Sequence, residues 1–88
     1  MKRVDDLRLY RYAGCMWCGM VERALAGLEL ELELCDIHQD SEHRQALLNA
    51  TGRQTVPCLR ITEGGEDRWM HESSAIIEYL QERFAGAA

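Results

Sequence analysis

A change of hydrophobic period in the first third of the chain restricts its fold most strongly. From Cys18 to Leu28, apolar residues recur every three or four positions, which predicts an amphipathic helix ending near Gly27. From Leu28 to Leu34, leucine and glutamate alternate strictly, which predicts a strand with one buried and one charged face. Because every second side chain is charged, this strand should lie at the edge of a sheet.

The remaining elements follow from similar patterns. Alternation over Leu7–Tyr12 predicts a first strand, and Ser41 is placed to cap a helix from Glu42 to Ala50. The last three predicted elements are a strand over Thr55–Ile61, an antiparallel strand over Arg68–His71 after the turn Glu63–Glu66, and a helix from the cap Ser73 to Phe84. The order β-α-β-α-β-β-α predicts an α/β fold, with helices on both faces of a four-stranded mixed sheet.

Composition limits the range of partners and locations. With 88 residues, 47% of them hydrophobic, the chain should form a single domain over residues 1–88. Its net charge of −5 argues against nucleic acid and against an anionic membrane surface. The sequence shows no export signal or membrane-length apolar segment, and its four cysteines accompany regular periodicity. We therefore expect a cytoplasmic monomer.

Two cysteines lie three positions apart where the first strand meets the first helix. The N-terminus of a helix carries unpaired N–H groups and partial positive charge, which lower the pKa of a nearby thiol. This makes Cys15 the candidate nucleophile and Cys18, on the buried stripe, the candidate resolving thiol. A C-x-x-C pair in a β-α-β context is typical of thioredoxin-like redox motifs.

Other uses of the cysteines and histidines are less well supported by the spacing. A structural zinc site would need a second closely spaced pair, which Cys35 and Cys58 do not provide, so we expect no metal. Both are interpreted as buried, small apolar residues. The three histidines also show no ligand spacing and are interpreted as ordinary polar residues: His38, His43 and His71.

Three motifs together resemble those of the glutaredoxin family, within the thioredoxin superfamily. They are Cys15-Met-Trp-Cys18, Gly52-Arg-Gln-Thr-Val-Pro57 and Glu72-Ser-Ser-Ala-Ile-Ile-Glu-Tyr-Leu80. The third is most similar to the glutathione-binding N-terminal domain of glutathione S-transferases. The resemblance covers essentially the whole chain and implies a glutathione site beside the Cys15 sulfur.

The resemblance also implies roles for particular residues around glutathione. It implies a cis Pro57, with the backbone of Val56 pairing with the cysteinyl part of the tripeptide. It places Glu72 and Ser73 at the γ-glutamyl end, where a helix N-terminus can also receive a carboxylate. Ser73 can serve as a helix cap at the same time.

Two further residues are assigned by the same resemblance. Arg53 would approach the glycyl carboxylate, which a guanidinium can hold with two hydrogen bonds. Trp17 would flank the bound tripeptide, although it could equally pack as a partly buried aromatic residue.

The chain departs from the glutaredoxin pattern at two positions near the thiols. Met16 replaces the usual proline, so the family's reduction potential does not transfer. Tyr12 replaces a common lysine, and Arg11, although adjacent, should point to the opposite face of its strand.

The main functional prediction is a glutathione-dependent thiol–disulfide oxidoreductase. Cys15 would attack protein disulfides or glutathionylated proteins, with glutathione as the reductant, and so serve electron transport and cell redox homeostasis. The alternatives are a glutathione-binding, transferase-like module without redox catalysis and a redoxin reduced by thioredoxin reductase. A bridging iron–sulfur cluster on Cys15 ranks lower, because Cys18 offers an internal disulfide partner.

Overall fold

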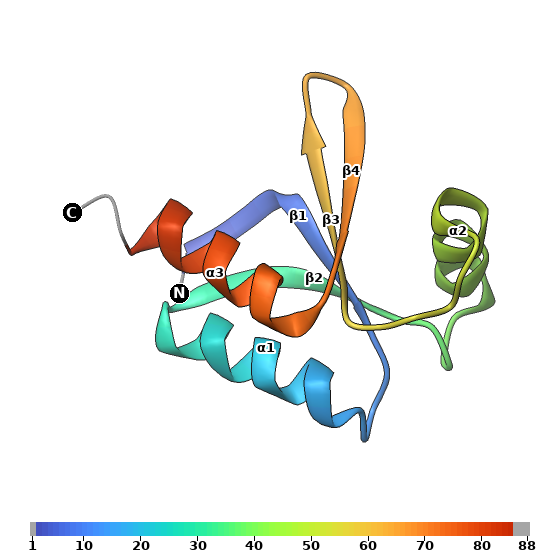
Figure 1. Cartoon of the computed structure of the whole chain (residues 1–88), viewed down its shortest axis with the longest axis horizontal. Helices are drawn as coiled ribbons and strands as arrows, with labels where there is room; N and C mark the ends of the chain where they lie inside the picture. The colour runs from blue at the N-terminus through green and yellow to red at the C-terminus, as the bar shows by residue number, and fades with distance from the viewer. Residues whose placement is uncertain (1, 86–88) are drawn as a thin grey trace.

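The computed structural model describes residues 2–85, which form a four-stranded sheet and three helices (Figure 1). In chain order the elements are β1 (Lys2–Arg11), α1 (Met16–Gly27), β2 (Leu30–Asp36), α2 (Ser41–Thr51), β3 (Cys58–Glu63), β4 (Glu66–His71) and α3 (Ser73–Phe84). The predicted order of elements and the mixed sheet are confirmed. Within residues 2–85, no helix has the length and apolar character needed to cross a membrane.

The sheet has the strand order β2-β1-β3-β4, with β2 parallel to β1 and the other neighbours antiparallel. The prediction that the leucine–glutamate strand lies at an edge is confirmed. Leu30 and Leu32 are buried as expected, but Leu34 is 46% exposed, contrary to the prediction. The reason is its position on the edge strand, where a shallow hollow beside α1 leaves its side chain in contact with solvent.

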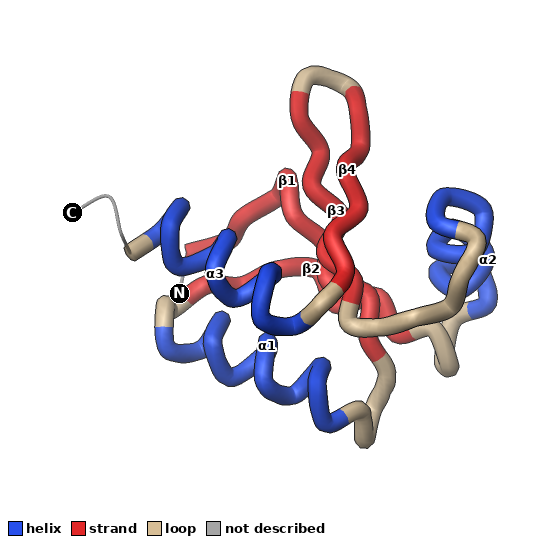
Figure 2. Tube along the Cα trace, in the orientation of Figure 1, coloured by secondary structure: helices blue, strands red, loops and turns tan. Residues whose placement is uncertain are grey.

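Two hydrophobic clusters lie on opposite faces of the sheet. Figure 2 shows α1 and α3 side by side, and α2 apart from them. The cluster under α1 and α3 contains the buried residues Val4, Leu7, Leu9, Val21, Leu25, Leu30, Leu32, Leu59, Ile61, Ile76 and Leu80. The smaller cluster under α2 contains Tyr10, Cys35, Ile37, Leu47 and Cys58.

Two helices begin one residue away from their predicted caps. Asp40, not Ser41, is the N-cap of α2, and its Oδ1 accepts a hydrogen bond from the Glu42 amide at 2.9 Å. Glu72, not Ser73, is the N-cap of α3 and has a positive φ of 74°. Asp40 was missed because either residue type can cap a helix, and backbone conformation decides which one does.

Strand boundaries also differ from the prediction, and the starts of β1 and β3 differ most. β1 begins at Lys2 rather than Leu7, because Lys2 pairs with Leu30 of β2. β3 begins at Cys58 rather than Thr55, since a proline has no N–H to donate to a strand ladder. The segment before Cys58 therefore remains a loop.

Candidate functional site

The two closely spaced cysteines meet at the start of α1. Cys15 is the N-cap of this helix, and its Sγ accepts a hydrogen bond from the Cys18 amide at 3.2 Å. The two residues are joined by a disulfide, with their Cα atoms 5.2 Å apart. Cys15 is partly exposed, whereas Cys18 is fully buried. The amide contact and the helix dipole favour negative charge on Cys15 once the pair is reduced.

An arginine on β1 holds the elements around this loop in place. Arg11 donates from Nε to Glu22 of α1 and from Nη1 to Asp36 of β2, both at 3.0 Å. The three side chains are largely shielded from solvent. Tyr12 packs instead with the α2-side cluster and stacks on His38, with ring centroids 4.2 Å apart. Arg11 and Tyr12 therefore face opposite sides of the sheet, as predicted.

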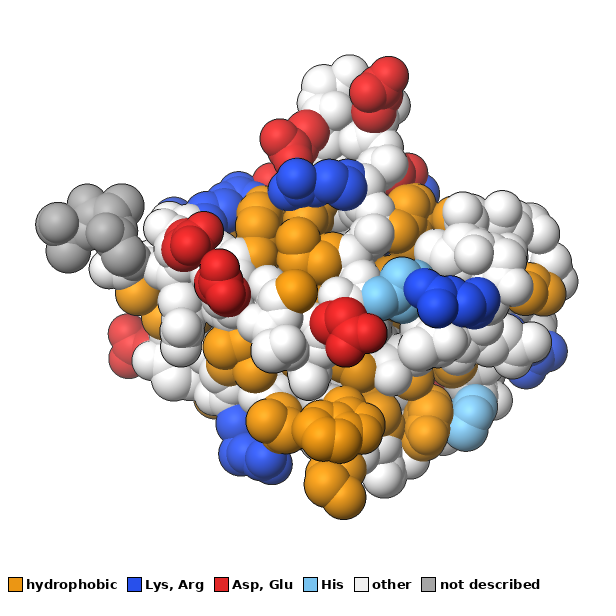
Figure 3. Space-filling view, in the orientation of Figure 1, with side chains coloured by type: hydrophobic (Ala, Val, Ile, Leu, Met, Phe, Trp, Pro, Cys, Tyr) orange, Lys and Arg blue, Asp and Glu red, His pale blue; other side chains and the backbone are white. Residues whose placement is uncertain are grey.

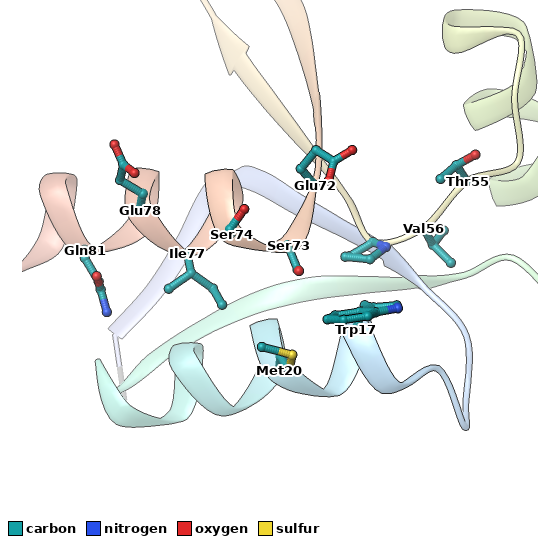
Figure 4. Close-up of a pocket in the computed structure, with 11 residues that line it drawn as sticks. Trp17, Met20, Thr55, Val56, Glu72, Ser73, Ser74, Ile77, Glu78 and Gln81 are labelled. Carbon is teal, nitrogen blue, oxygen red and sulfur yellow. The ribbon is translucent and has the colours of Figure 1, made fainter.

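An open groove of about 710 Å³ lies between α1, α3 and the loop before β3 (Figure 4). It is lined by Trp17, Met20, Thr55, Val56, Pro57, Glu72, Ser73, Ser74, Ile77, Glu78 and Gln81. In Figure 4, Ser73 and Ile77 point from α3 toward α1, and Trp17 and Met20 lie across from them. Apolar side chains also gather over α1 in Figure 3, where Met16 is 72% and Trp17 57% exposed.

Two backbone features give this groove its polar groups. The Val56–Pro57 peptide bond is cis, and Val56 lies outside the sheet, in the loop that borders the groove. The Glu72 side chain at the N-cap accepts no hydrogen bond from the amides in the first turn of α3. The first helical amides of α3, starting at Ser73, are therefore placed to receive an anionic group.

Most residues proposed from the sequence come together here. Five line the groove: Trp17, Val56, Pro57, Glu72 and Ser73. Cys15 and Cys18 adjoin it through the first turn of α1, while Arg53 is exposed in the loop after α2 and is not part of the lining. The structure thus leaves the Arg53 assignment a prediction.

Several lining residues were missed by the sequence reasoning. Met20 lies one helical turn after Trp17, and Ile77 and Gln81 follow Ser73 at intervals of four. Side chains at these spacings share a helix face. This periodicity was the available signal, although which two helix faces meet depends on the tertiary fold.

The other two cysteines are chemically different from the disulfide pair. Burial raises the pKa of Cys58 to about 12, although the charge of Arg53 opposes the shift. Burial, followed by the charge of Glu33, raises the pKa of Cys35 to about 12. Burial, followed by the charge of Arg53, lowers the pKa of His71. The thiols of Cys35 and Cys58 therefore stay protonated at neutral pH, which agrees with their interpretation as buried apolar residues.

Residues 9–88 match the family model of the glutathione S-transferase N-terminal domain. The chain belongs to this family. Membership supports the resemblance to glutathione S-transferases that was drawn from the Glu72-Ser73 motif. The comparisons do not show that this chain, here called a transferase-type domain, is a glutaredoxin. No curated protein matches the sequence significantly.

Solved structures similar to this transferase-type domain are themselves larger proteins. The trimeric glutathione transferase of Leishmania aligns with a TM-score of 0.75 and 30% identity, over 92% of this chain and 18% of its own. The maleylacetoacetate isomerase of Anaeromyxobacter dehalogenans with bound glutathione aligns with a TM-score of 0.70 and 29% identity, over 93% of this chain and 39% of its own. The Omega 2S glutathione transferase of Trametes versicolor aligns with a TM-score of 0.74 over 93% of this chain and 38% of its own. At 19% identity it supports the fold alone. The chain therefore spans less than two fifths of the length of these structures.

Proposed function

We propose that this transferase-type domain binds glutathione in the groove between α1 and α3. The observation that carries the proposal is the convergence of Val56, cis Pro57, Glu72 and Ser73 on one groove, at a helix N-terminus without a side-chain cap among the described residues. Two comparisons support it independently: the chain belongs to the glutathione S-transferase N-terminal domain family, and the structurally similar Anaeromyxobacter isomerase carries bound glutathione.

Each part of the tripeptide has a chemically suitable position. Val56 lies in the loop outside the sheet, so its backbone can pair with the cysteinyl part as a short added strand. The α-carboxylate of the γ-glutamyl end would accept hydrogen bonds from the first amides of α3. Glu72, exposed at the same point, would pair with the ammonium group beside that carboxylate. These contacts direct the glutathione sulfur toward the start of α1.

Binding can be tested without any thiol chemistry by calorimetric titration of the disulfide form with S-methylglutathione. We expect Glu72→Gln to weaken binding about tenfold, because it removes a charge-assisted hydrogen bond. Glu82→Gln is a matched control, since it makes the same charge change on α3 outside the groove. Equal effects of the two substitutions, or no binding by the parent protein, would contradict the proposal.

A second function is favoured by the Cys15–Cys18 disulfide beside this groove. We propose that the reduced pair carries out thiol–disulfide exchange with glutathione as the reductant. The Cys15 thiolate attacks a disulfide sulfur, forming a mixed disulfide as the partner's other sulfur leaves as a thiolate. Cys18 or a glutathione thiolate then attacks the Cys15 sulfur of this mixed disulfide and releases the partner as a thiolate. The first route leaves a Cys15–Cys18 disulfide and the second leaves glutathione on Cys15. In either route two glutathione molecules in total are oxidised to glutathione disulfide as Cys15 and Cys18 return to thiols. A cytoplasmic location and a monomeric state stay predictions.

The exchange reaction is tested by mass spectrometry of Cys18→Ser after incubation with oxidised glutathione. We expect a single glutathione adduct, on Cys15, because the substitution removes the internal thiol that would release it. Cys15→Ser is the control and should carry no adduct. An adduct on Cys35 or Cys58, or no adduct, would contradict exchange at Cys15. If the parent nevertheless binds S-methylglutathione, the domain is a binding module without redox catalysis.

A further inference from the structure

A second group of reactive side chains lies on the α2 face of the sheet, away from the groove. Glu33 and Cys35 lie on β2, and His43 lies on α2. One potential ligand atom from each residue lies within 4.8 Å of the other two. Sequence spacing did not indicate this group, because the turn between β2 and α2 brings its members together.

We propose that Glu33, Cys35 and His43 form a binding site for a divalent transition metal, with zinc as the best match. Thiolate sulfur, imidazole nitrogen and carboxylate oxygen are the three ligand types that zinc accepts in proteins. Magnesium and calcium prefer sites made of oxygen alone, so this ligand set disfavours them. Three protein ligands leave the fourth position to water.

The distances are compatible with a tetrahedral ion. The Cys35 Sγ and Glu33 Oε2 atoms are 3.5 Å apart, close to the roughly 3.5 Å expected between neighbouring ligands of tetrahedral zinc. The other oxygen of Glu33, Oε1, lies 3.9 Å from Arg8 Nε, so the two oxygens have different partners. His43 is only partly buried, so its imidazole is not locked in place by packing. Ligation would require a shift of roughly 1 Å, the amount by which a spacing of 4.8 Å exceeds the separation of zinc ligands.

Residues around the three ligands also fit a metal site. Asp40 Oδ2 lies 3.6 Å from His43 Nε2, while Asp40 Oδ1 is held by the Glu42 amide. A carboxylate that bonds to one ring nitrogen fixes the orientation of a metal-bound histidine, and a small approach of Asp40 to His43 would make such a bond. The ring of Tyr10, beside Cys35 in the sheet, contacts His43 edge-on, with centroids 6.0 Å apart.

Binding would change the state of the Cys35 thiol. Without metal, the thiol donates a hydrogen bond to Glu33. When zinc binds, the S–H proton leaves to water and a zinc–sulfur bond forms, with no change in oxidation state. The ion also neutralises the negative charges that the thiolate and the carboxylate would otherwise place side by side.

Cobalt(II) provides a spectroscopic test in the full chain. With the Cys15–Cys18 disulfide closed, those sulfurs are not available, so a thiolate-to-cobalt absorption band would report Cys35 or Cys58. We expect one cobalt per chain, a band that one equivalent of zinc removes, and loss of that band in Cys35→Ala. His43→Ala should weaken cobalt binding by about tenfold or more.

Cys58 supplies a matched control. Its sulfur lies 3.9 Å from His71 Nε2 and, like Cys35, it is fully buried beside Tyr10, but this pair offers two ligands where the proposed site offers three. We expect Cys58→Ala to keep the band. Absence of the band in the parent protein, or its dependence on Cys58, would overturn the proposal. If circular dichroism shows that Cys35→Ala is unfolded, the His43→Ala variant provides the test instead. Unchanged cobalt affinity in His43→Ala would also overturn the proposal.

Discussion

The two pairs of cysteines in this domain occupy very different surroundings. Cys15 and Cys18 form a disulfide at the N-terminus of α1, next to the groove. Cys35 and Cys58 lie on the opposite face of the sheet, where their strands place them on either side of Tyr10. The comparison teaches that position relative to a helix terminus and to solvent, not residue type, decides which sulfur can react.

The physical difference lies in the stability of the thiolate. The Cys15 sulfur already accepts an N–H hydrogen bond at a helix N-terminus, an arrangement that favours the anion. Burial raises the pKa of Cys35 and Cys58 to about 12, so their thiols stay neutral and pack as apolar groups. A metal ion at Cys35 would be the exception, because the ion replaces the proton.

The largest expected effect is on alkylation of the reduced protein. At neutral pH we expect Cys15 to react with iodoacetamide at least about a thousandfold faster than Cys35 or Cys58, since a pKa near 12 leaves only about one thiol in 10⁵ ionised. Pulse labelling followed by peptide mass spectrometry measures the three rates. Comparable rates would remove the distinction between the two pairs.

Serine substitution should give the next largest effect. In the reduced protein, Cys58→Ser should lower the free energy of unfolding by about 2 kcal/mol, because it buries a hydroxyl in an apolar cluster. Cys15→Ser should change it by less than about 0.5 kcal/mol, since serine is a good N-cap at a partly exposed position. Urea denaturation of both variants gives the comparison. Equal losses would show that Cys15 is as tightly packed as Cys58.

Raising the pH by one unit above pH 9 should give the smallest effect for each buried thiol. The ordinary thiol pKa is 9.0 and the folded value about 12, so between these values the folded state holds a proton that the unfolded state releases. Stability should therefore fall above pH 9, by up to about 1.4 kcal/mol per pH unit for each buried thiol. In the Cys35→Ala/Cys58→Ala double variant, the free energy of unfolding should fall less steeply with pH, because these two thiols no longer contribute. Denaturation at several pH values measures this slope. An unchanged slope would contradict the raised pKa values.

The sequence predicted the elements better than it predicted their ends. The alternation of leucine and glutamate in β2 and the apolar stripe of α1 show in the sequence itself which side chains are buried, so both elements were predicted. The N-caps Asp40 and Glu72 were missed because capping depends on backbone geometry that neighbouring polar residues do not reveal. The exposure of Leu34 was missed because it depends on how much of an edge strand the helices cover.

The residues of the candidate site also divide into those that the local sequence predicts and those that depend on the tertiary fold. Motifs of adjacent residues, such as Cys15–Cys18 and Glu72-Ser73, could be proposed directly from the sequence. Lining residues such as Met20 and Ile77 could not, because two helices distant in the chain have to meet before their faces form one groove. The cluster of Glu33, Cys35 and His43 required the packing of α2 against β2 in the same way.

The contacts of Arg11 bear on the proposed redox cycle of the disulfide. This one guanidinium ties the end of β1 to both α1 and β2, so the short loop carrying Cys15 is anchored at each end. We therefore expect oxidised and reduced forms to share nearly the same backbone. In the proposed exchange, attack at the Cys15 sulfur would then need little movement of the backbone.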